Sequence, residues 1–197
     1  MDLNDTSVKK NGNISYIDDN GDTYYNDDNG LPVHIVYADG TERWNTFDDR
    51  QRLSHYELSN GYSETFEYND TGSIISATNS NGQKCTFDYT PNGKDIIHEI
   101  TYDGIENWYT YNDTGLKTGI HVKKFNSRYN AIIEIWKDLD EKGQVYHQKN
   151  SMGNESWREY DANGNMVKYQ NEAGVIELIE YDDNHNIISS KIIKNEQ

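Results

Sequence analysis

Short runs of alternating apolar and polar residues, each closed by a polar turn, fill most of the chain. Eight anchor side chains mark a period along it, with separations of 22, 21, 21, 22, 28, 21 and 21 residues. A turn glycine follows five of these anchors by four residues: Tyr68, Tyr89, Tyr111, Leu139 and Tyr160. The other three, Tyr25, Phe47 and Tyr181, keep the spacing without that glycine. A fixed period of this length indicates stacked supersecondary units.

A second glycine divides most of these units in two. It lies seven residues before the next anchor, at Gly40, Gly61, Gly82, Gly104, Gly153 and Gly174. In the unit from Tyr68 to Tyr89, one strand is expected to include Ile74 and Ile75, and the return strand to cover 83–89. Glycine suits the positive φ that tight hairpin turns require. We therefore predict an all-β fold, a repeat array of antiparallel β-hairpins that forms one curled sheet with two strands per unit.

Alternation along a strand assigns the aromatic residues to two faces of this sheet. An anchor shares its face with the residue two positions earlier. Phe66, Phe87 and Tyr109 are therefore expected to be buried on a common face. All four tryptophans lie three positions before an anchor, on the opposite face: Trp44, Trp108, Trp136 and Trp157. The turns after Phe47 and Tyr181, which lack the glycine, are expected to use another geometry or to be strained.

Composition changes this interpretation little. A mean hydropathy of −1.01 and a net charge of −16 by themselves favour disorder. Sixteen tyrosines, four tryptophans and four phenylalanines oppose that conclusion, because aromatic rings supply large apolar areas to a thin β-structure. Cys85 is the only cysteine, which excludes an intrachain disulfide, and it is interpreted as a structural thiol.

The chain shows no composition break or proline-rich linker, so we expect one continuous body. Residues 1–24 are predicted to be an acidic polar N-terminal segment with room for a partial repeat, and residues 25–197 a β-hairpin repeat domain. The wide spacing between Tyr111 and Leu139 marks an insertion, 117–130, that holds 4 of the 18 basic residues. Such insertions often lie on the binding face of a repeat protein. Residues 189–194 are predicted to form an edge strand, with two lysines that protect it.

One unit resembles a known repeat family. Tyr160-Asp-Ala-Asn-Gly-Asn-Met166, a second glycine at Gly174 and the next tyrosine at Tyr181 resemble the YD repeat of RHS proteins. The resemblance extends over roughly residues 25–197. It implies a curling strip of β-hairpins, which in large bacterial toxins and in teneurins closes into a hollow shell. This chain is far shorter than those arrays.

Residues of catalytic type form no recognised arrangement along the chain. Six histidines are scattered among the units without a zinc, nucleophile or phosphate-loop motif, and we interpret them as solvated or turn residues. Backbone capping explains the aspartates and asparagines at the turns. The acidic loops at 16–21 and 159–164 lack the ligand spacing of an EF-hand. We therefore expect no enzymatic activity, no cofactor and no metal site.

Location and charge suggest the kind of partner. No signal peptide and no apolar stretch near the roughly 18 residues of a membrane span occur in the sequence, so we expect a cytoplasmic protein without a membrane partner. A net charge of −16 disfavours nucleic acid and favours a basic protein.

The leading hypothesis is a non-enzymatic immunity protein of a bacterial polymorphic-toxin system, which masks a basic toxin domain. It combines the resemblance with the acidic charge. The expected partner-binding residues are Asp18, Asp19, Asp27, Asp28, Phe125, Arg128 and Tyr129. One alternative is a structural fragment of a larger RHS shell. Another is a surface carbohydrate-binding module that uses exposed tryptophan rings.

Overall fold

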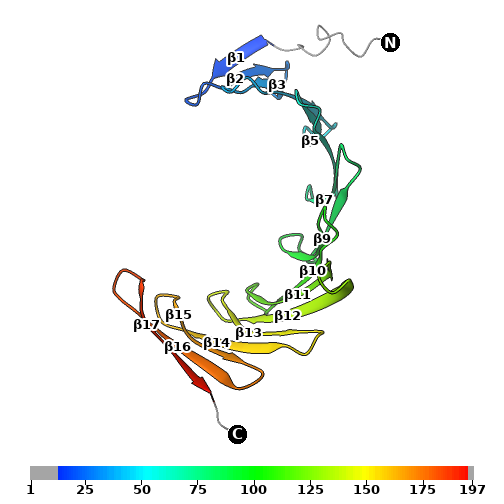
Figure 1. Cartoon of the computed structure of the whole chain (residues 1–197). Coiled ribbons are helices and arrows are strands. Elements are labelled where there is room, and N and C mark those ends of the chain that lie inside the picture. The colour runs from blue at the N-terminus through cyan, green and yellow to red at the C-terminus, as the bar shows by residue number, and fades with distance from the viewer. Residues whose placement is uncertain (1–12, 195–197) are drawn as a thin grey trace. The chain divides into compact units, whose positions relative to one another are not determined.

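The computed structural model describes residues 13–194, which form seventeen β-strands and no helix (Figure 1). The predicted all-β array of antiparallel hairpins, with two strands per repeat, is confirmed. These residues accordingly contain no helix that is long and apolar enough to cross a membrane. The chain divides into two compact units, Met1–Phe87 and Asp88–Gln197.

In the first unit every strand pairs antiparallel with the next strand along the chain. The strands are β1 (Asn13–Ile17), β2 (Thr23–Asn26), β3 (Pro32–Val36), β4 (Glu42–Phe47), β5 (Leu53–Leu58), β6 (Ser63–Tyr68), β7 (Ile74–Asn79) and β8 (Lys84–Tyr89), the last of which crosses the boundary between the units. The β1–β2 hairpin spans 13–26 and so extends two residues past the segment 1–24 that was expected to have room for a partial repeat.

The second unit repeats this arrangement. Its strands are β9 (Ile96–Ile100), β10 (Glu106–Tyr111), β11 (Lys117–Asn126), β12 (Ala131–Leu139), β13 (Val145–Asn150), β14 (Glu155–Tyr160), β15 (Met166–Asn171), β16 (Val175–Tyr181) and β17 (Ile187–Lys194). The predicted strand at 189–194 is part of β17, which pairs with β16 along one edge.

The turns are built by the polar residue that follows each anchor. After Tyr160, the Oδ1 atom of Asp161 accepts hydrogen bonds from the backbone amides of Asn163 and Asn165, both at 2.9 Å. The amide of Gly164 donates to the Asp161 carbonyl at 3.1 Å, and the φ of this glycine is +89°. The carboxylate thus satisfies the backbone groups that the hairpin leaves open, as such side chains do in tight turns.

The two turns that lack a glycine four residues after the anchor have the same backbone geometry, with a strained non-glycine residue at that position. Gln51 and His185 occupy the glycine position with φ values of +62° and +64°. Asp48 and Asp182 bind the turn amides as Asp161 does. A non-glycine residue in this region is strained because its Cβ approaches the backbone. Of the two outcomes that the sequence left open, strain is the one observed.

The first anchor was placed one residue too early. Asp27 is the carboxylate that closes the turn after β2, and Gly30 is its glycine of positive φ. The position that corresponds to the other anchors is therefore Asn26 and not Tyr25. Tyr25 instead stacks on His34, on the opposite face. The prediction was wrong here because an aromatic side chain beside the true position gave nearly the same spacing.

Anchor tyrosines join the two strands of a hairpin to each other. The hydroxyl of Tyr160 donates to the carbonyl of Val145 at 2.8 Å, over a sequence separation of 15 residues. Three other anchors make the same bond at the same separation, namely Tyr68 to Leu53, Tyr111 to Ile96 and Tyr181 to Met166. This regular hydrogen bond explains why tyrosine is the preferred anchor.

The core is thinner than the sequence predicted. Phe66, Phe87 and Tyr109 are half-buried rather than buried. In the described part of the chain, strands contact only strands that neighbour them in sequence, so no second layer covers either face of a unit. The buried apolar residues are few: Ile35, Ala77, Cys85, Ile133, Leu139 and Ile179. Cys85 is free and buried, which agrees with a structural thiol.

Candidate functional site

The histidines and tryptophans form stacked pairs across neighbouring strands. In the first unit His34 on β3 lies directly opposite Trp44 on β4. Their ring centres are 5.3 Å apart and the ring planes differ by 5°. His34 is 1% exposed, because Tyr25 covers the other side of its ring. These three rings lie on the face of the sheet where strand alternation places the tryptophans, opposite the anchors.

The second unit has a stack of its own, which extends over four strands, β9 to β12. The rings of His98, Trp108, His121 and Trp136 follow one another with centre separations of 5.0, 4.7 and 4.9 Å. Each pair also lies opposite in the strand register. Lys117 contacts Tyr109 and Tyr111 together. This common contact confirms that Trp108, at odd spacing from both tyrosines, lies on the face opposite its anchor.

A separate pair lies on the next hairpin, between β13 and β14. The rings of His147 and Trp157 are 5.4 Å apart at an angle of 21°. Trp157 is 38% exposed and is the most exposed of the four tryptophans. Its cross-strand neighbour on β15 is Gln170 rather than another ring. No ring stack is recorded on the other side of Trp157 among the described residues.

Each stacked histidine is hydrogen-bonded to a glutamate two residues before its tryptophan. For His147 the bond joins Nε2 to Oε1 of Glu155 at 2.7 Å. The corresponding pairs are His34 with Glu42 at 2.8 Å, His98 with Glu106 at 3.2 Å and His121 with Glu134 at 2.8 Å. The glutamate holds the imidazole flat against the indole ring, so the three side chains act as one unit.

Two of these histidines are also hydrogen-bonded to a second carboxylate, which lies on the preceding strand. Nδ1 of His147 lies 2.6 Å from Oδ2 of Asp138. The pKa of His147 is raised, first by its hydrogen bond to Asp138 and then by Glu155, against the opposing effect of burial. Nδ1 of His98 lies 3.0 Å from Asp88 in the same way.

The interpretation of the histidines as solvated or turn residues was wrong for these four. The sequence holds a signal that could have revealed them. Histidine precedes glutamate by eight residues in three units, and the glutamate precedes tryptophan by two. In the fourth unit the insertion widens the first spacing to 13. Eight residues is the separation of partners across a hairpin of this repeat, so the pattern predicts direct pairing.

The chemistry available to these groups is limited. The described residues contain no group of three or more histidine, cysteine, aspartate or glutamate side chains that could hold a metal ion. The histidines contact carboxylates and indole rings rather than a serine or cysteine nucleophile. The arrangement stabilises the hairpins and places carboxylates along one face.

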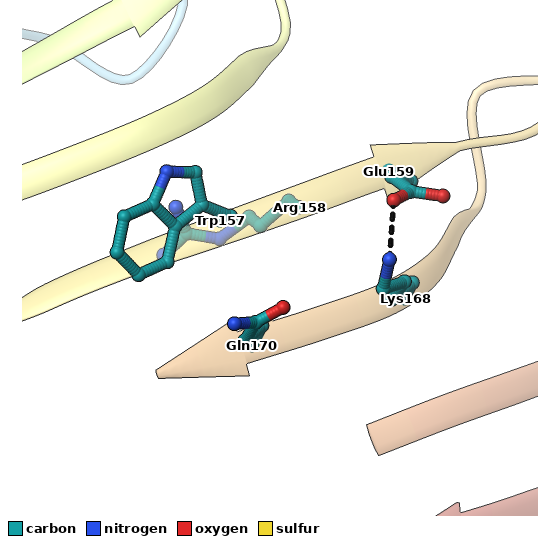
Figure 2. A pocket seen from close by; sticks show the side chains of 5 residues that line it. All are labelled: Trp157, Arg158, Glu159, Lys168 and Gln170. Atoms are coloured by element: carbon teal, nitrogen blue, oxygen red, sulfur yellow. Dashed lines mark hydrogen bonds and ion pairs between the residues drawn. The ribbon is translucent and has the colours of Figure 1, made fainter. Parts of the chain in front are cut away.

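A shallow hollow lies beside Trp157, with a volume of about 300 Å³ (Figure 2). Arg158, Gln170 and an ion pair between Lys168 and Glu159, at 2.6 Å, complete its lining. A second and wider hollow, of about 570 Å³, is bordered by Asp140, Tyr146 and Tyr160. Both are open depressions on the surface of a sheet, and the first offers one ring with polar groups around it.

The acidic residues expected to bind a partner lie in two turns of the first unit. Asp18 and Asp19 are in the β1–β2 turn, and Asp27 and Asp28 are in the β2–β3 turn. These turns are at opposite ends of β2, so the structure does not bring the two pairs together. Asp18 and Asp27 use Oδ1 to bind turn amides. Asp19 and Asp28 are exposed.

The structure does bring Phe125, Arg128 and Tyr129 together. They lie at the end of the β11–β12 hairpin, which the insertion lengthens. The guanidinium of Arg128 is 5.7 Å from the centre of the Tyr129 ring. Phe125 and Tyr129 are 63% and 50% exposed.

Two solved structures have a fold similar to that of this chain. A crystal structure of TcdB2-TccC3-TEV matches with 13% identity and a TM-score of 0.51, covering 88% of this chain and 11% of that one. A Photorhabdus luminescens Tc holotoxin pore structure with a TccC3 mutation matches with 13% identity and a TM-score of 0.54, covering 87% and 10%. This chain thus spans about a tenth of those chains. No protein-family model and no curated protein sequence matches it.

Proposed function

We propose that this chain is a structural wall segment of an RHS-type β-repeat shell. The observation that carries the proposal is the repeated bond from an anchor hydroxyl to a carbonyl 15 residues earlier. This bond ties the two strands of each hairpin together and uses no other part of the chain. A repeat that contacts only its neighbours can lengthen a sheet by one hairpin at a time, as in other repeat proteins.

Two further observations support a structural role. The fold is similar to that of chains roughly eight times longer, one of them in a Tc holotoxin pore. The hollows described above are shallow, and the histidines are already bonded to carboxylates. A wall segment needs strong contacts between neighbouring hairpins and little else, which is what the described residues provide.

The test is to measure the chain length and the assembly state of the protein as its source cells produce it. Intact-mass measurement of the purified protein is expected to show the repeats continuing in one longer chain. Electron microscopy should then show a closed particle with an interior protected from protease. A native product of 197 residues that forms no particle would contradict the proposal.

A second candidate is an immunity-type protein that masks a basic toxin domain in the cytoplasm. The observation that favours it is the net charge of −16, together with the exposed carboxylates of Asp19 and Asp28. Such a surface steers a basic partner electrostatically, and association should slow as salt is added. The aromatic residues Phe125 and Tyr129 would supply the buried contacts.

Co-expression distinguishes the two candidates. The immunity role predicts that this chain restores growth of cells that produce a toxin encoded next to it. Reversing the charges of Asp18, Asp19, Asp27 and Asp28 should weaken binding to that toxin. If growth is not restored, the immunity role is excluded and the wall segment is unaffected.

A further inference from the structure

The β11–β12 hairpin extends beyond the strands on either side of it. The pairing of β10 with β11 ends at Glu106 and Lys123. On the other side, the pairing of β12 with β13 ends at Ile135 and Asn150. Residues 124–133 therefore form a two-stranded ribbon that pairs only with itself. We call this segment the hairpin tip.

Apolar and aromatic side chains are exposed on the hairpin tip. Phe125 lies opposite Ile132 across the ribbon, and these side chains are 63% and 60% exposed. Tyr129 follows in the turn, and Arg128 lies against its ring. A cluster of exposed apolar residues with a charged rim is typical of an interaction surface.

The hairpin tip and its base also reverse the charge of the rest of the chain. Residues 117–133 contain Lys117, Lys123, Lys124 and Arg128 and no aspartate or glutamate, although the whole chain carries −16. Lys123 is paired with Glu106. No ion pair of Lys124 or Arg128 is recorded with any carboxylate of the described residues. The basic tip therefore suits an acidic partner, and this chain as a whole is strongly acidic.

The first unit contains a hollow of matching character. It lies beside the β2–β3 and β4–β5 turns and has a volume of about 410 Å³. Leu31, Val33 and Phe47 supply apolar lining, and the charged residues that line it are all aspartates. Asp27 and Asp48 are engaged with turn amides, and Asp48 also with Arg52. Asp49 is exposed and is the carboxylate best placed to receive a cation from outside.

We propose that the hairpin tip of one copy of this chain docks into this hollow on a second copy. The rings of Phe125 and Tyr129 would cover the apolar lining, and Arg128 would pair with Asp49. The two copies repel each other at long range, but at physiological ionic strength such repulsion is screened beyond about 8 Å. A protruding tip brings the complementary charges together while the bodies stay farther apart.

The contact uses different surfaces on the two copies, so it is heterologous and leads to rings or open chains. It is also small, because stable interfaces use roughly 20–30 residues on each side. We therefore expect weak, reversible association that depends on concentration.

Charge exchange tests the proposal on the full chain, by sedimentation velocity over a range of concentrations. Arg128→Glu places a carboxylate against Asp49, and Asp49→Lys places two cations together. Each variant alone should weaken association by at least about tenfold. An equimolar mixture should recover wild-type association, because every tip then finds a hollow of opposite charge on the other variant. Circular dichroism checks that both variants fold.

Matched controls are Lys94→Glu and Asp183→Lys, which reverse exposed charges elsewhere, and Ile188→Ser, which removes an exposed apolar side chain from β17. All three should associate like the wild type. The proposal is overturned if the wild type remains monomeric at every concentration, if the single variants associate normally, or if the mixture does not recover. Loss of association in Ile188→Ser alone would assign the contact to β17 instead.

Discussion

At the scale of single residues, the carboxylates around the histidines have the clearest energetic consequence. His147 lies between Asp138 and Glu155 and against the indole ring of Trp157. All three neighbours favour the protonated imidazole, two by charge and one through its π-face. The hydrogen bonds and charges of Asp138 and Glu155 raise the pKa of His147 against the opposing effect of burial.

The raised pKa makes stability depend on pH. Because the folded protein holds the His147 proton more tightly than the unfolded chain, the resulting stabilisation is fully present below about pH 6.5, the unfolded pKa. It is lost as pH rises through the folded pKa. We expect the free energy of unfolding to fall between pH 6 and pH 8.5 in urea titrations, and His147→Gln to flatten that slope. His55→Gln is the control, because His55 bonds to the neutral hydroxyl of Thr65. An unchanged slope in His147→Gln would contradict this assignment.

A second residue-scale prediction concerns the strained turn at Gln51. Replacement by glycine relieves a left-handed conformation that costs about 1–2 kcal/mol. Glycine also loses about 0.5–1 kcal/mol more conformational entropy on folding. Gln51→Gly should therefore raise the free energy of unfolding by up to about 1.5 kcal/mol. Gly61→Ala is the matched reverse change, since φ is +86° there and an added Cβ meets nothing within 4 Å. It should destabilise, and equal effects of the two variants would rule out the strain argument.

At the scale of the hairpin, the anchor hydroxyl is a contact that joins the two paired strands. Tyr160→Phe keeps the ring and removes only the bond to the Val145 carbonyl. The expected loss is about 1 kcal/mol, the usual net value of such a bond. Tyr146→Phe is the control, because Tyr146 is exposed and no bond of its hydroxyl is recorded in the described residues. Urea unfolding measures both, and similar losses would show that the hydroxyl has no special role.

At the scale of the whole molecule, strands contact only their neighbours in sequence, so stability should be a sum of local terms. Tyr160→Ala is therefore expected to speed amide hydrogen exchange in β13 to β16 and to leave β2 to β6 unchanged. Mass spectrometry of peptic fragments gives both rates in one experiment. Faster exchange throughout the chain would show a single cooperative unit instead.

The sequence by itself determined the period, the strands and the opposite phase of the tryptophans, because hairpin turns and alternation are local properties of the chain. It also located the insertion that becomes the hairpin tip. It did not distinguish Tyr25 from Asn26, since an aromatic beside the true anchor preserves the spacing to within one residue. Only the tertiary structure decided that Phe66 and Phe87 are half-buried and that His147 lies between two carboxylates. Burial and pKa depend on which side chains meet across strands and on whether a second layer covers them, and neither is a property of spacing alone.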